Sequence, residues 1–417
     1  METAQLPDKI GAMTPFSVLR LRHIRLLWIG QLLSAFGDLF FEIAIVWLSV
    51  QIIGSEAGFV LAAGSITRLA FGLIGGYFAD IWDRQKTMIV IDLLRALSIL
   101  SLPVAALLGE ITLFHLAVIS AIDGALSAIF EPALQSSLPQ LTKNSQELQG
   151  GNALLDVTSR MARIFAPGVA GFIIGFIPIE QFFTIDALTF GISALALVAI
   201  GRNFKWKVTS DEPRPFGWQT ITADLRQALR LLRENTAVYY SLFSFLAANI
   251  VWAGAMTVGL ALLADGRLDV GVQGYSFLIT VYGVGSVLSN LVIGSMTIKN
   301  RPRFLFAGAI IYGLGLLLIG LSGSFPMALA GAFVAALGTP MSDLMIVIMI
   351  QEEFPENQVG KIYSLRLTIS SVGYSLGLLL AAYLFELTAV STGIFWFGVV
   401  MIGIGIWGVI RFLNHSH

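Results

Sequence analysis

The amino-acid sequence contains no cysteine, and only four of its 417 residues are histidine. Without cysteine the chain can form no disulfide, iron–sulfur cluster or thiolate metal site, and it has no cysteine nucleophile. The four histidines are scattered along the sequence, so they do not form the close group that a metal site requires. The sequence also lacks a Walker-type phosphate loop. We therefore expect no metal, no cofactor, and no enzymatic or ATP-hydrolysing centre.

Charged residues are scarce as well, at 12% of the chain, against about 25% in a typical soluble domain. Hydrophobic residues make up 56% of the chain, and the mean hydropathy is +0.82. The formal net charge of −1 gives no overall attraction to nucleic acid, so nucleic acid is not an expected partner. This composition predicts a protein that lies in a lipid bilayer.

Apolar stretches of about 20 residues, the length that crosses a bilayer, recur along the whole chain. Their approximate ranges are 24–50, 55–79, 87–108, 111–136, 152–176, 181–200, 237–264, 271–296, 304–322, 325–350, 361–384 and 390–411. The pattern predicts an all-α membrane protein of twelve transmembrane helices in two pseudo-symmetric six-helix bundles. We expect an N-terminal bundle over 1–200, a cytoplasmic linker over 201–236 and a C-terminal bundle over 237–417.

The linker contains apolar residues at helical spacing opposite a row of arginines, which predicts an amphipathic helix on the membrane surface. The apolar residues are Ile221, Leu225, Leu229 and Leu232, and the arginines are Arg226, Arg230 and Arg233. Almost all basic residues outside the predicted spans lie on the linker's side, and Arg267 alone lies on the other. This asymmetry places both termini and the linker in the cytoplasm.

The two halves also share short sequence patterns. "GGYFADIWDRQK" (75–86) follows the second span, and "IGSMTIKNRPR" (293–303) follows the eighth with a glycine and a basic cluster in similar places. Internal duplication with a binding site between the repeats is common among secondary transporters. The sequence therefore favours a transporter whose site lies between two bundles.

The loop after the second span resembles motif A of the major facilitator superfamily, through Gly76, Asp80, Asp83, Arg84 and Lys86. The order of six spans, a long central loop and six further spans resembles the same superfamily over essentially the whole chain. The motif A sequence of this chain departs from the common pattern of the superfamily, because Ile81 stands in place of a basic residue and Asp83 in place of a glycine. "DLLRAL" (92–97), "GNALLD" (151–156) and "TIDALTFGISAL" (184–195) resemble the drug:proton antiporter branch that holds macrolide efflux proteins and the enterobactin exporter.

This resemblance implies a multi-pass protein of the bacterial cytoplasmic (inner) membrane that acts as a monomer. It also implies a gating latch, in which the motif A acid contacts the eleventh span when the cavity faces outward. The latch residues here are Gly76, Asp80, Asp83, Arg84 and Arg366, with Asp80–Arg366 as the central contact. Alternatively, Arg84 and Lys86 only set the topology and Asp80 is solvated.

Ionisable side chains at bilayer depth cost about 2.5–3.5 kcal/mol each, so they face a cavity or a partner. Asp38 and Glu42 lie one turn apart on the first span, and Arg68 lies at similar depth on the second. A carboxyl beside an arginine can be either protonated or ionised and paired with the arginine. Proton coupling requires a group that changes between these two states. We therefore expect Asp38 to couple protons or contact substrate, with Glu42 and Arg68 modulating it; a static ion pair is the alternative.

Other polar groups have less defined roles. Asp123 and Glu131 on the fourth span are either further protonation sites or hydrogen-bonded packing groups. If spans one, four, seven and ten line the cavity, as the resemblance implies, then Asn249 and Asp343 also face it. Near the linker side we expect a network of structural ion pairs, Asp92 with Arg95 and Asp156 with Arg160, next to Arg163.

These observations predict a proton-coupled secondary active exporter of an amphipathic organic compound, such as a drug, a macrolide or a siderophore. Its partners would be this small molecule, protons and the lipid bilayer. A lysophospholipid flippase or a small-molecule importer on the same fold is the alternative, because "QLLSAFGD" (31–38) resembles the start of bacterial lysophospholipid transporters. A membrane enzyme or sensor is disfavoured, because the chain has no soluble domain.

Overall fold

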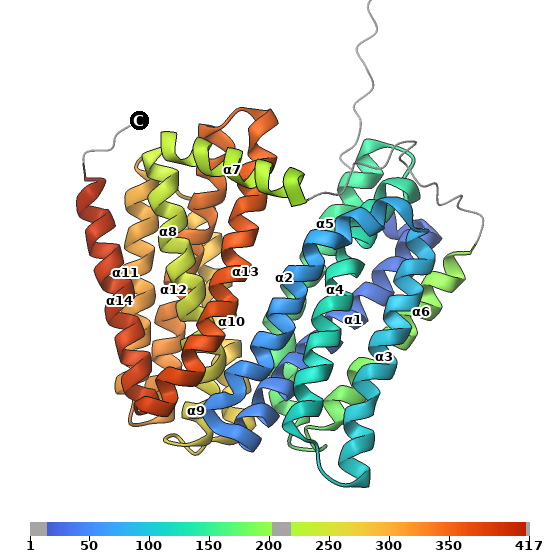
Figure 1. Cartoon of the computed structure of the whole chain (residues 1–417), viewed down its shortest axis with the longest axis horizontal. Coiled ribbons are helices and arrows are strands. Elements are labelled where there is room, and N and C mark those ends of the chain that lie inside the picture. Colours follow the sequence, from blue (N-terminus) through green and yellow to red (C-terminus); the bar gives the residue numbers. More distant parts are fainter. Residues whose placement is uncertain (1–14, 202–217, 414–417) are drawn as a thin grey trace, which may run out of the picture.

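The computed structural model describes residues 15–201 and 218–413. Within these ranges, side chains are described except for 15–17, 73–81, 218–225 and 356–357. The described chain folds into helices and contains no strand (Figure 1). The first half, after a short helical turn at Pro15–Arg20, contains α1 (Arg22–Ile53), α2 (Ala57–Ile81), α3 (Arg84–Leu108), α4 (Leu113–Leu141), α5 (Ser145–Ile173) and α6 (Gln181–Ile200).

The second half begins with α7 (Trp218–Glu234), which lies across the ends of the long helices (Figure 1). We call this end of the molecule the linker end and the opposite one the far end. The remaining elements are α8 (Thr236–Val251), η3 (Trp252–Gly259), α9 (Leu260–Asp265), α10 (Gly271–Gly294), α11 (Arg301–Leu321), α12 (Phe325–Glu353), α13 (Glu356–Leu387) and α14 (Val390–Arg411).

Ten segments of the described chain are long and apolar enough to cross a membrane. The first of them, Arg22–Gly72, contains all of α1 and most of α2, which are antiparallel helices. The helix α5, which carries Asp156, Arg160 and Arg163, is not among the ten. The segment Thr236–Asp265 is continuous through α8, η3 and α9, so it acts as one crossing element. These elements together make the twelve crossings that the hydropathy pattern predicts.

The crossing helices form two pseudo-symmetric bundles of six, one from each half of the chain (Figure 1). The contacts between the bundles follow the same symmetry. The second crossing element of the first bundle, α2, packs on the fifth of the second bundle, α13, and α5 packs in the same way on α10. These two seams hold the bundles together.

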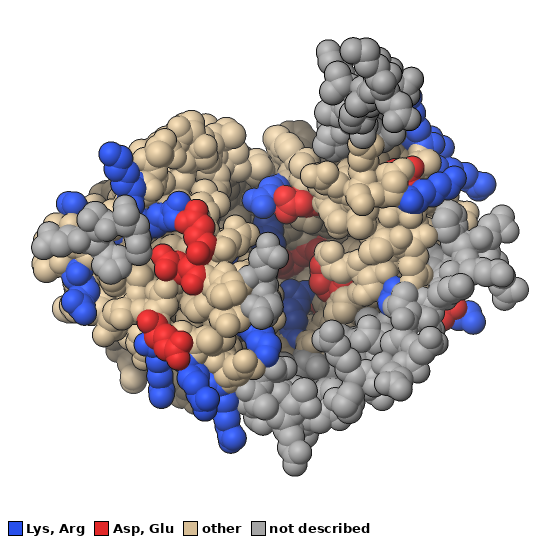
Figure 2. Space-filling model, turned by 90° about the horizontal axis from the view of Figure 1, so that it is seen from above, with Lys and Arg blue, Asp and Glu red and all other residues tan. Residues whose placement is uncertain are grey.

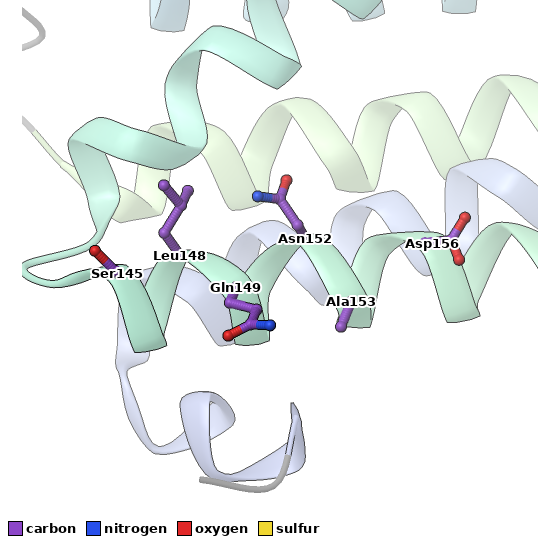
Figure 3. A pocket seen from close by; sticks show the side chains of 6 residues that line it. All are labelled: Ser145, Leu148, Gln149, Asn152, Ala153 and Asp156. Atoms are coloured by element: carbon purple, nitrogen blue, oxygen red, sulfur yellow. The ribbon is translucent and has the colours of Figure 1, made fainter. Parts of the chain in front are cut away.

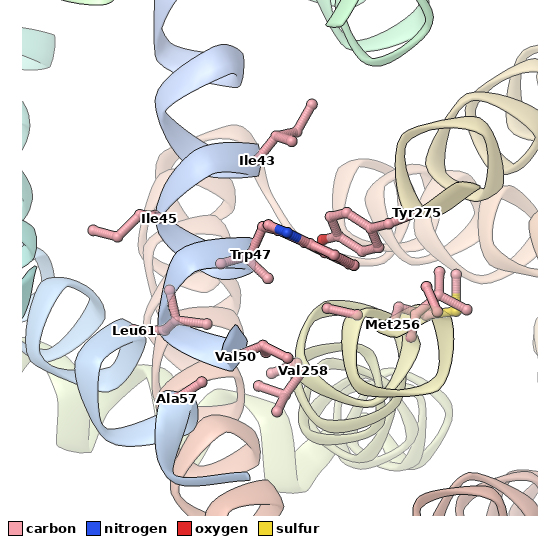
Figure 4. Close-up of a cluster of buried hydrophobic side chains, with 14 of the residues drawn as sticks. Ile43, Ile45, Trp47, Val50, Ala57, Leu61, Met256, Val258 and Tyr275 are labelled. Carbon is pink, nitrogen blue, oxygen red and sulfur yellow. The ribbon is translucent and has the colours of Figure 1, made fainter. Parts of the chain in front are cut away.

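The far end is closed by one apolar cluster that draws residues from both bundles. Trp47 of α1 stacks on Tyr275 of α10, with ring centroids 6.1 Å apart, and Val258 of η3 lies close to Val50 of α1 (Figure 4). Ser65 of α2 and Ser375 of α13 share a hydrogen bond of 2.7 Å between their hydroxyl oxygens. Apolar burial and this bond close the far end.

The linker end is open. The apolar clusters near it each belong to a single bundle, one formed within the second half and two within the first. Viewed from this end, the molecule is hollowed between the bundles, and both acidic and basic side chains line the hollow (Figure 2). The molecule therefore contains a cavity between the bundles that is open at the linker end and sealed at the far end.

The helix α7 packs on α8 and α13 at the linker end of the second bundle. Ala228 and Leu232 are buried there, whereas Leu229 is exposed together with Arg226, Arg230 and Arg233. Lys361 of α13 donates a 2.6 Å hydrogen bond to Gln227. The amphipathic helix expected in the linker is present, and its apolar face covers protein. Ile221 and Leu225 lie outside the described side chains.

Candidate functional site

Arg95 of α3 is the centre of a polar group inside the first bundle. Its Nη2 lies 2.7 Å from Asp38 Oδ1 of α1, and its Nε donates a 2.7 Å hydrogen bond to Asp123 Oδ1 of α4. The guanidinium carbon lies 3.9 Å from the ring centroid of Phe190 on α6, in the geometry of a cation–π contact. Side chains from three neighbouring helices therefore surround a cation that α3 carries.

Two further acids surround this ion-paired centre. Asp186 of α6 is fully buried, and Asp38, Arg95 and Asp123 act on it electrostatically. Its Oδ1 accepts a long hydrogen bond of 3.5 Å from Thr189, and its Oδ2 has no hydrogen bond. Asp92, one turn before Arg95, is also fully buried beside Ser193 of α6, and neither of its carboxyl oxygens has a hydrogen bond of normal geometry. We call Asp38, Asp92, Arg95, Asp123 and Asp186 the acidic group.

Small residues let these helices approach closely enough to build the acidic group. Gly37 of α1 faces α6 at the acidic group, where an added Cβ would overlap the side chains of Asp186 and Thr189. Gly124, next to Asp123, touches the backbone of Gly64 on α2. Close backbone contact through small residues is a usual way of packing helices in membranes. The glycines therefore set the spacing that brings acids from four helices around Arg95.

The charge balance of the acidic group defines its chemistry. Four carboxyl groups lie around one guanidinium, and a guanidinium stays protonated at all relevant pH values. A buried carboxylate without a counterion is strongly destabilised, and neighbouring carboxylates repel one another. Such a group is stable only if some of its carboxyls carry protons. The arrangement can therefore hold and exchange protons. Among the described residues there is no cluster of three His, Cys, Asp or Glu arranged to hold a metal ion.

Asp38 connects the acidic group to the cavity. Its side chain is 44% exposed, whereas that of Arg95 is 6% exposed and that of Asp123 is 12% exposed. Glu42, one turn further along α1, is exposed between the buried residues Phe41 and Ile43. The α1 helix thus turns one acidic edge to the cavity and its apolar side to the far-end seal.

Arg68 and Arg163 lie at the bottom of the cavity, where the two bundles meet. Arg68 is exposed on α2, one turn from Ser65 in the seam with α13. Arg163 is exposed on α5, and its carbonyl oxygen lies 3.5 Å from the position that a Cβ on Gly283 of α10 would take. These two arginines are the cations that act on Glu42 electrostatically, without forming an ion pair with it among the described side chains.

The second bundle contributes its own polar wall. Arg366 Nη2 of α13 lies 4.0 Å from Asp343 Oδ1 of α12, and its guanidinium lies over the ring of Phe245. Asn249 of α8 donates to the carbonyl oxygen of Phe245 and accepts a 2.7 Å hydrogen bond from Ser370 of α13. Asp343 is exposed, at 55% of its side chain. Asp343 and Asn249 therefore belong to the second bundle, whereas Asp38 belongs to the first.

The expected latch residues occupy different environments. Gly76 and Asp80 both lie in the segment 73–81, whose side chains are not described, so the Asp80–Arg366 contact stays a prediction. Asp83 caps α3 by accepting a hydrogen bond from the backbone N–H of Lys86. Arg84 is buried and donates a 2.8 Å hydrogen bond to the carbonyl oxygen of Ser136 on α4. Asp83 and Arg84 therefore make these contacts inside the first bundle.

The expected pairing within α3 is wrong. Arg95 forms no ion pair with Asp92, because its guanidinium reaches across to α1 and α4 while Asp92 faces α6. The pair expected on α5 is present, with Arg160 Nε 2.8 Å from Asp156 Oδ2, and both side chains are exposed. Glu131 of α4 is exposed and accepts a hydrogen bond from Gln135, and it has no contact with the acidic group.

A surface pocket at the start of α5 does not belong to this site. All of the side chains that line it come from one helix near the linker end (Figure 3), namely Ser145, Leu148, Gln149, Asn152, Ala153 and Asp156. Among the described residues, no second element lines this pocket. The described part of it is an open groove along α5, without the enclosing walls that a small-molecule site needs.

Reasoning from the sequence missed Asp186, which completes the acidic group, and Phe190, whose ring contacts Arg95. The signal was available for Asp186, because it is an acid within the apolar run of the sixth predicted span. Nothing in the sequence indicated Phe190 as a partner of Arg95, because an aromatic residue in an apolar helix is ordinary. The π-helical conformation of η3, next to Asn249, was not predicted either. Short π-helical segments within a longer helix often occur at functional sites.

Comparison with known proteins shows which family the chain resembles in sequence and in fold. The model of the family described as "Transmembrane secretion effector" matches residues 13–402. The chain is 23% identical to macrolide efflux protein A of Streptococcus pyogenes, over 85% of this chain and 87% of that protein. It is 24% identical to the enterobactin exporter EntS of Escherichia coli, over 82% of this chain and 80% of that protein. A crystal structure of a peptide transporter of the POT family in complex with sulfate has the same fold, with a TM-score of 0.73, 14% identity and coverage of 95% of this chain and 98% of that chain.

Proposed function

Because the chain belongs to the transmembrane secretion effector family of the major facilitator superfamily, we propose that it is a proton-coupled exporter of an amphipathic organic compound. It is a multi-pass membrane protein, and its relatives include a macrolide efflux protein and an enterobactin exporter. Both names describe movement of an organic molecule out of a bacterial cell. We place this chain in the bacterial cytoplasmic membrane for the same reason.

The shape of the molecule supports transport by alternating access. The cavity is sealed at the far end by the apolar cluster. At the linker end the molecule is hollowed between the bundles (Figure 2). The excess of basic residues on the linker's side supports a cytoplasmic linker. In that orientation the cavity opens toward the cytoplasm, which is the state in which an exporter takes up its cargo.

The observation that carries the proton coupling is the position of Asp38. It is the member of the acidic group that is exposed to the cavity, and it is joined to the buried Arg95 by a 2.7 Å contact. When the cavity changes its opening, the water around Asp38 changes, and with it the balance between a protonated carboxyl and an ion pair. A proton taken up or released there accompanies each transport cycle.

Proton movement in proteoliposomes tests this function. Vesicles containing the native protein, with a pH-sensitive dye inside, receive an anionic siderophore, a cationic drug or a lysophospholipid. We expect one class to produce a proton signal that is absent in Asp38→Asn. The matched control is Asp265→Asn, an exposed aspartate at the far end of α9. A full proton signal in Asp38→Asn would exclude this residue as the coupling site. Movement of the lysophospholipid between leaflets without protons would favour a flippase.

A further inference from the structure

The bottom of the cavity holds two arginines for which no described residue is an ion-pair partner. Arg68 of α2 and Arg163 of α5 are exposed, and neither forms a hydrogen bond or an ion pair in the part of the chain that the structure describes. Two exposed acids of the cavity wall have cations of their own, because Asp38 pairs with Arg95 and Asp343 lies near Arg366. We call Glu42, Arg68, Arg163 and Tyr374 the floor group.

The floor group lies beside α1 and next to both seams between the bundles. Arg68 lies one turn from Ser65, which bonds Ser375 of α13. Arg163 lies on the opposite seam, beside Gly283 of α10. Glu42 of α1 is under the electrostatic influence of both arginines, and Tyr374 is influenced by both Glu42 and Arg68. Charges from three helices of the first bundle therefore act on one another electrostatically, and they also act on a phenol of the second bundle.

The charges of the floor group do not balance one another. Arg68 and Arg163 cannot lose their protons, so they supply two fixed positive charges. Glu42 supplies at most one negative charge, and it can be neutralised by a proton. Unpaired guanidinium groups at bilayer depth are costly. A planar oxyanion fits this position, because a guanidinium offers two parallel N–H donors to a carboxylate or phosphate.

The surroundings supply an apolar and aromatic wall next to these charges. Trp252 of η3 is partly exposed and lies 4.7 Å from the ring centroid of Tyr282. Tyr374 is partly exposed and contacts the hydroxyl of Thr257 through its own hydroxyl, at 3.4 Å. Aromatic faces accept flat hydrophobic bodies. The cavity thus offers cationic donors at its floor and aromatic side chains on the facing bundle.

We propose that Arg68 and Arg163 bind the carboxylate or phosphate of an amphipathic anion, and that Glu42 is the internal counterion which this anion displaces. This inference rests on the proposed export function and names the charge class of its cargo. It assigns the aromatic side chains Trp252 and Tyr374 to the apolar body of the same molecule. A cationic cargo would meet two fixed positive charges and be repelled from the floor.

The test is equilibrium dialysis of the purified full-length protein in nanodiscs of zwitterionic lipid against matched probes. 2-Naphthoate, 2-naphthylmethylammonium and 2-naphthylmethanol share one aromatic body and differ in charge. We expect 2-naphthoate to bind about tenfold more tightly than the neutral alcohol, the size of one charge-assisted hydrogen bond. Arg68→Gln and Arg163→Gln should each remove most of this advantage without changing the affinity for the alcohol.

Two further variants guard against a trivial loss of structure. Arg160→Gln removes an exposed arginine one turn from Arg163 on α5, and it should leave 2-naphthoate binding unchanged. Glu42→Gln removes the internal counterion and should tighten 2-naphthoate binding several-fold, a gain that misfolding cannot produce. Tighter binding of the cation, absence of 2-naphthoate binding, or unchanged affinity in Arg68→Gln and Arg163→Gln would each overturn the proposal.

The source of the oxyanion is resolved by a change of lipid. If anionic phosphatidylglycerol in the nanodisc competes with 2-naphthoate, the floor group takes a lipid headgroup; if it does not, the site takes a soluble anion. Both results support an oxyanion site. Failure of the export function has a different signature, which is the absence of proton-linked transport for all cargo classes. A proton-linked cation transporter would retain that function and contradict the charge assignment made here.

Discussion

Asp38 and Arg95 join the water-exposed wall of the cavity to a group of buried acids. Arg95 Nη2 lies 2.7 Å from Asp38 Oδ1, yet the Asp38 side chain is 44% exposed and that of Arg95 only 6%. The same guanidinium binds Asp123 on its inner side. A change in the water around Asp38 therefore acts directly on the counterion of the buried carboxyls, and this contact links cavity opening to protonation in the proposed mechanism.

Replacement of Arg95 should destabilise the first bundle strongly. Arg95→Gln leaves several buried carboxyls without a cation, and breaking a buried pair in this way costs about 3–5 kcal/mol. Arg95→Lys keeps the charge, but an ammonium cannot contact Asp38 and Asp123 through a fixed fork, so an intermediate loss is expected. Thermal unfolding in detergent measures both. Arg160→Gln is the control, because an exposed pair contributes about 0–1 kcal/mol. Equal unfolding temperatures for Arg95→Gln and Arg160→Gln would contradict the buried geometry.

The two inner acids should respond in opposite directions. Asp186→Asn replaces a fully buried carboxyl that makes no ion pair with a neutral amide of the same shape, and the amide can donate to a neighbouring carboxylate, so stability should be retained or increased. Asp123→Asn weakens a direct contact of Arg95 and should cost about 1–3 kcal/mol. Unfolding temperatures of the two variants under identical conditions decide the matter. A larger loss for Asp186→Asn would mean that its carboxylate is ionised and needed by Arg95.

The crossing helices were predictable because hydropathy and length alone fix them. An apolar stretch such as 304–322 is stable only as a helix in a bilayer or in the core of a helical protein. The depth of Asp38 and of Asp123 was predictable for the same reason, since an acid in such a run must face water or a partner. The partner itself was not predictable. Arg95 is one turn from Asp92 in sequence, but helix packing carries its long side chain to two other helices.

Pairing across helices depends on how closely the backbones approach, and this is determined by residues whose role is not visible one at a time. Gly37 brings α1 against Asp186, and Gly124 brings α4 against α2. The π-helical segment η3 likewise depends on tertiary contacts, such as those of Gly254 and Gly259 with Phe397 and Phe385. Local sequence preference gives no sign of such a segment.

Gly37 should be intolerant of any side chain. In Gly37→Ala the added Cβ overlaps Thr189 and Asp186, so α1 and α6 must separate and the acidic group loses its spacing. Overpacking of this kind costs about 1–3 kcal/mol. Gly191→Ala, on α6 with open space around the new Cβ, is the matched control and should be neutral or slightly stabilising. Thermal unfolding and the proton signal of the native cargo measure the two effects. Equal behaviour of the two variants would show that α1 and α6 are not in close contact.

The seal at the far end must open during each transport cycle, and a disulfide across it should stop transport. Ser65 and Ser375 are suitable positions, because their hydroxyl oxygens are 2.7 Å apart on α2 and α13 and a disulfide requires close Cβ atoms. The native chain has no cysteine, so Ser65→Cys with Ser375→Cys introduces the only thiols.

Mild oxidation of this double variant in proteoliposomes should abolish transport, and a reductant should restore it. Each single cysteine variant is the control, and it should transport equally well under oxidising and reducing conditions. The shift of the oxidised double variant on a gel after cleavage of the linker between the bundles reports the cross-link itself. A fully cross-linked protein that transports at the native rate would mean that the seam between α2 and α13 stays closed throughout the cycle. The far-end opening would then have to occur along the α5–α10 seam instead.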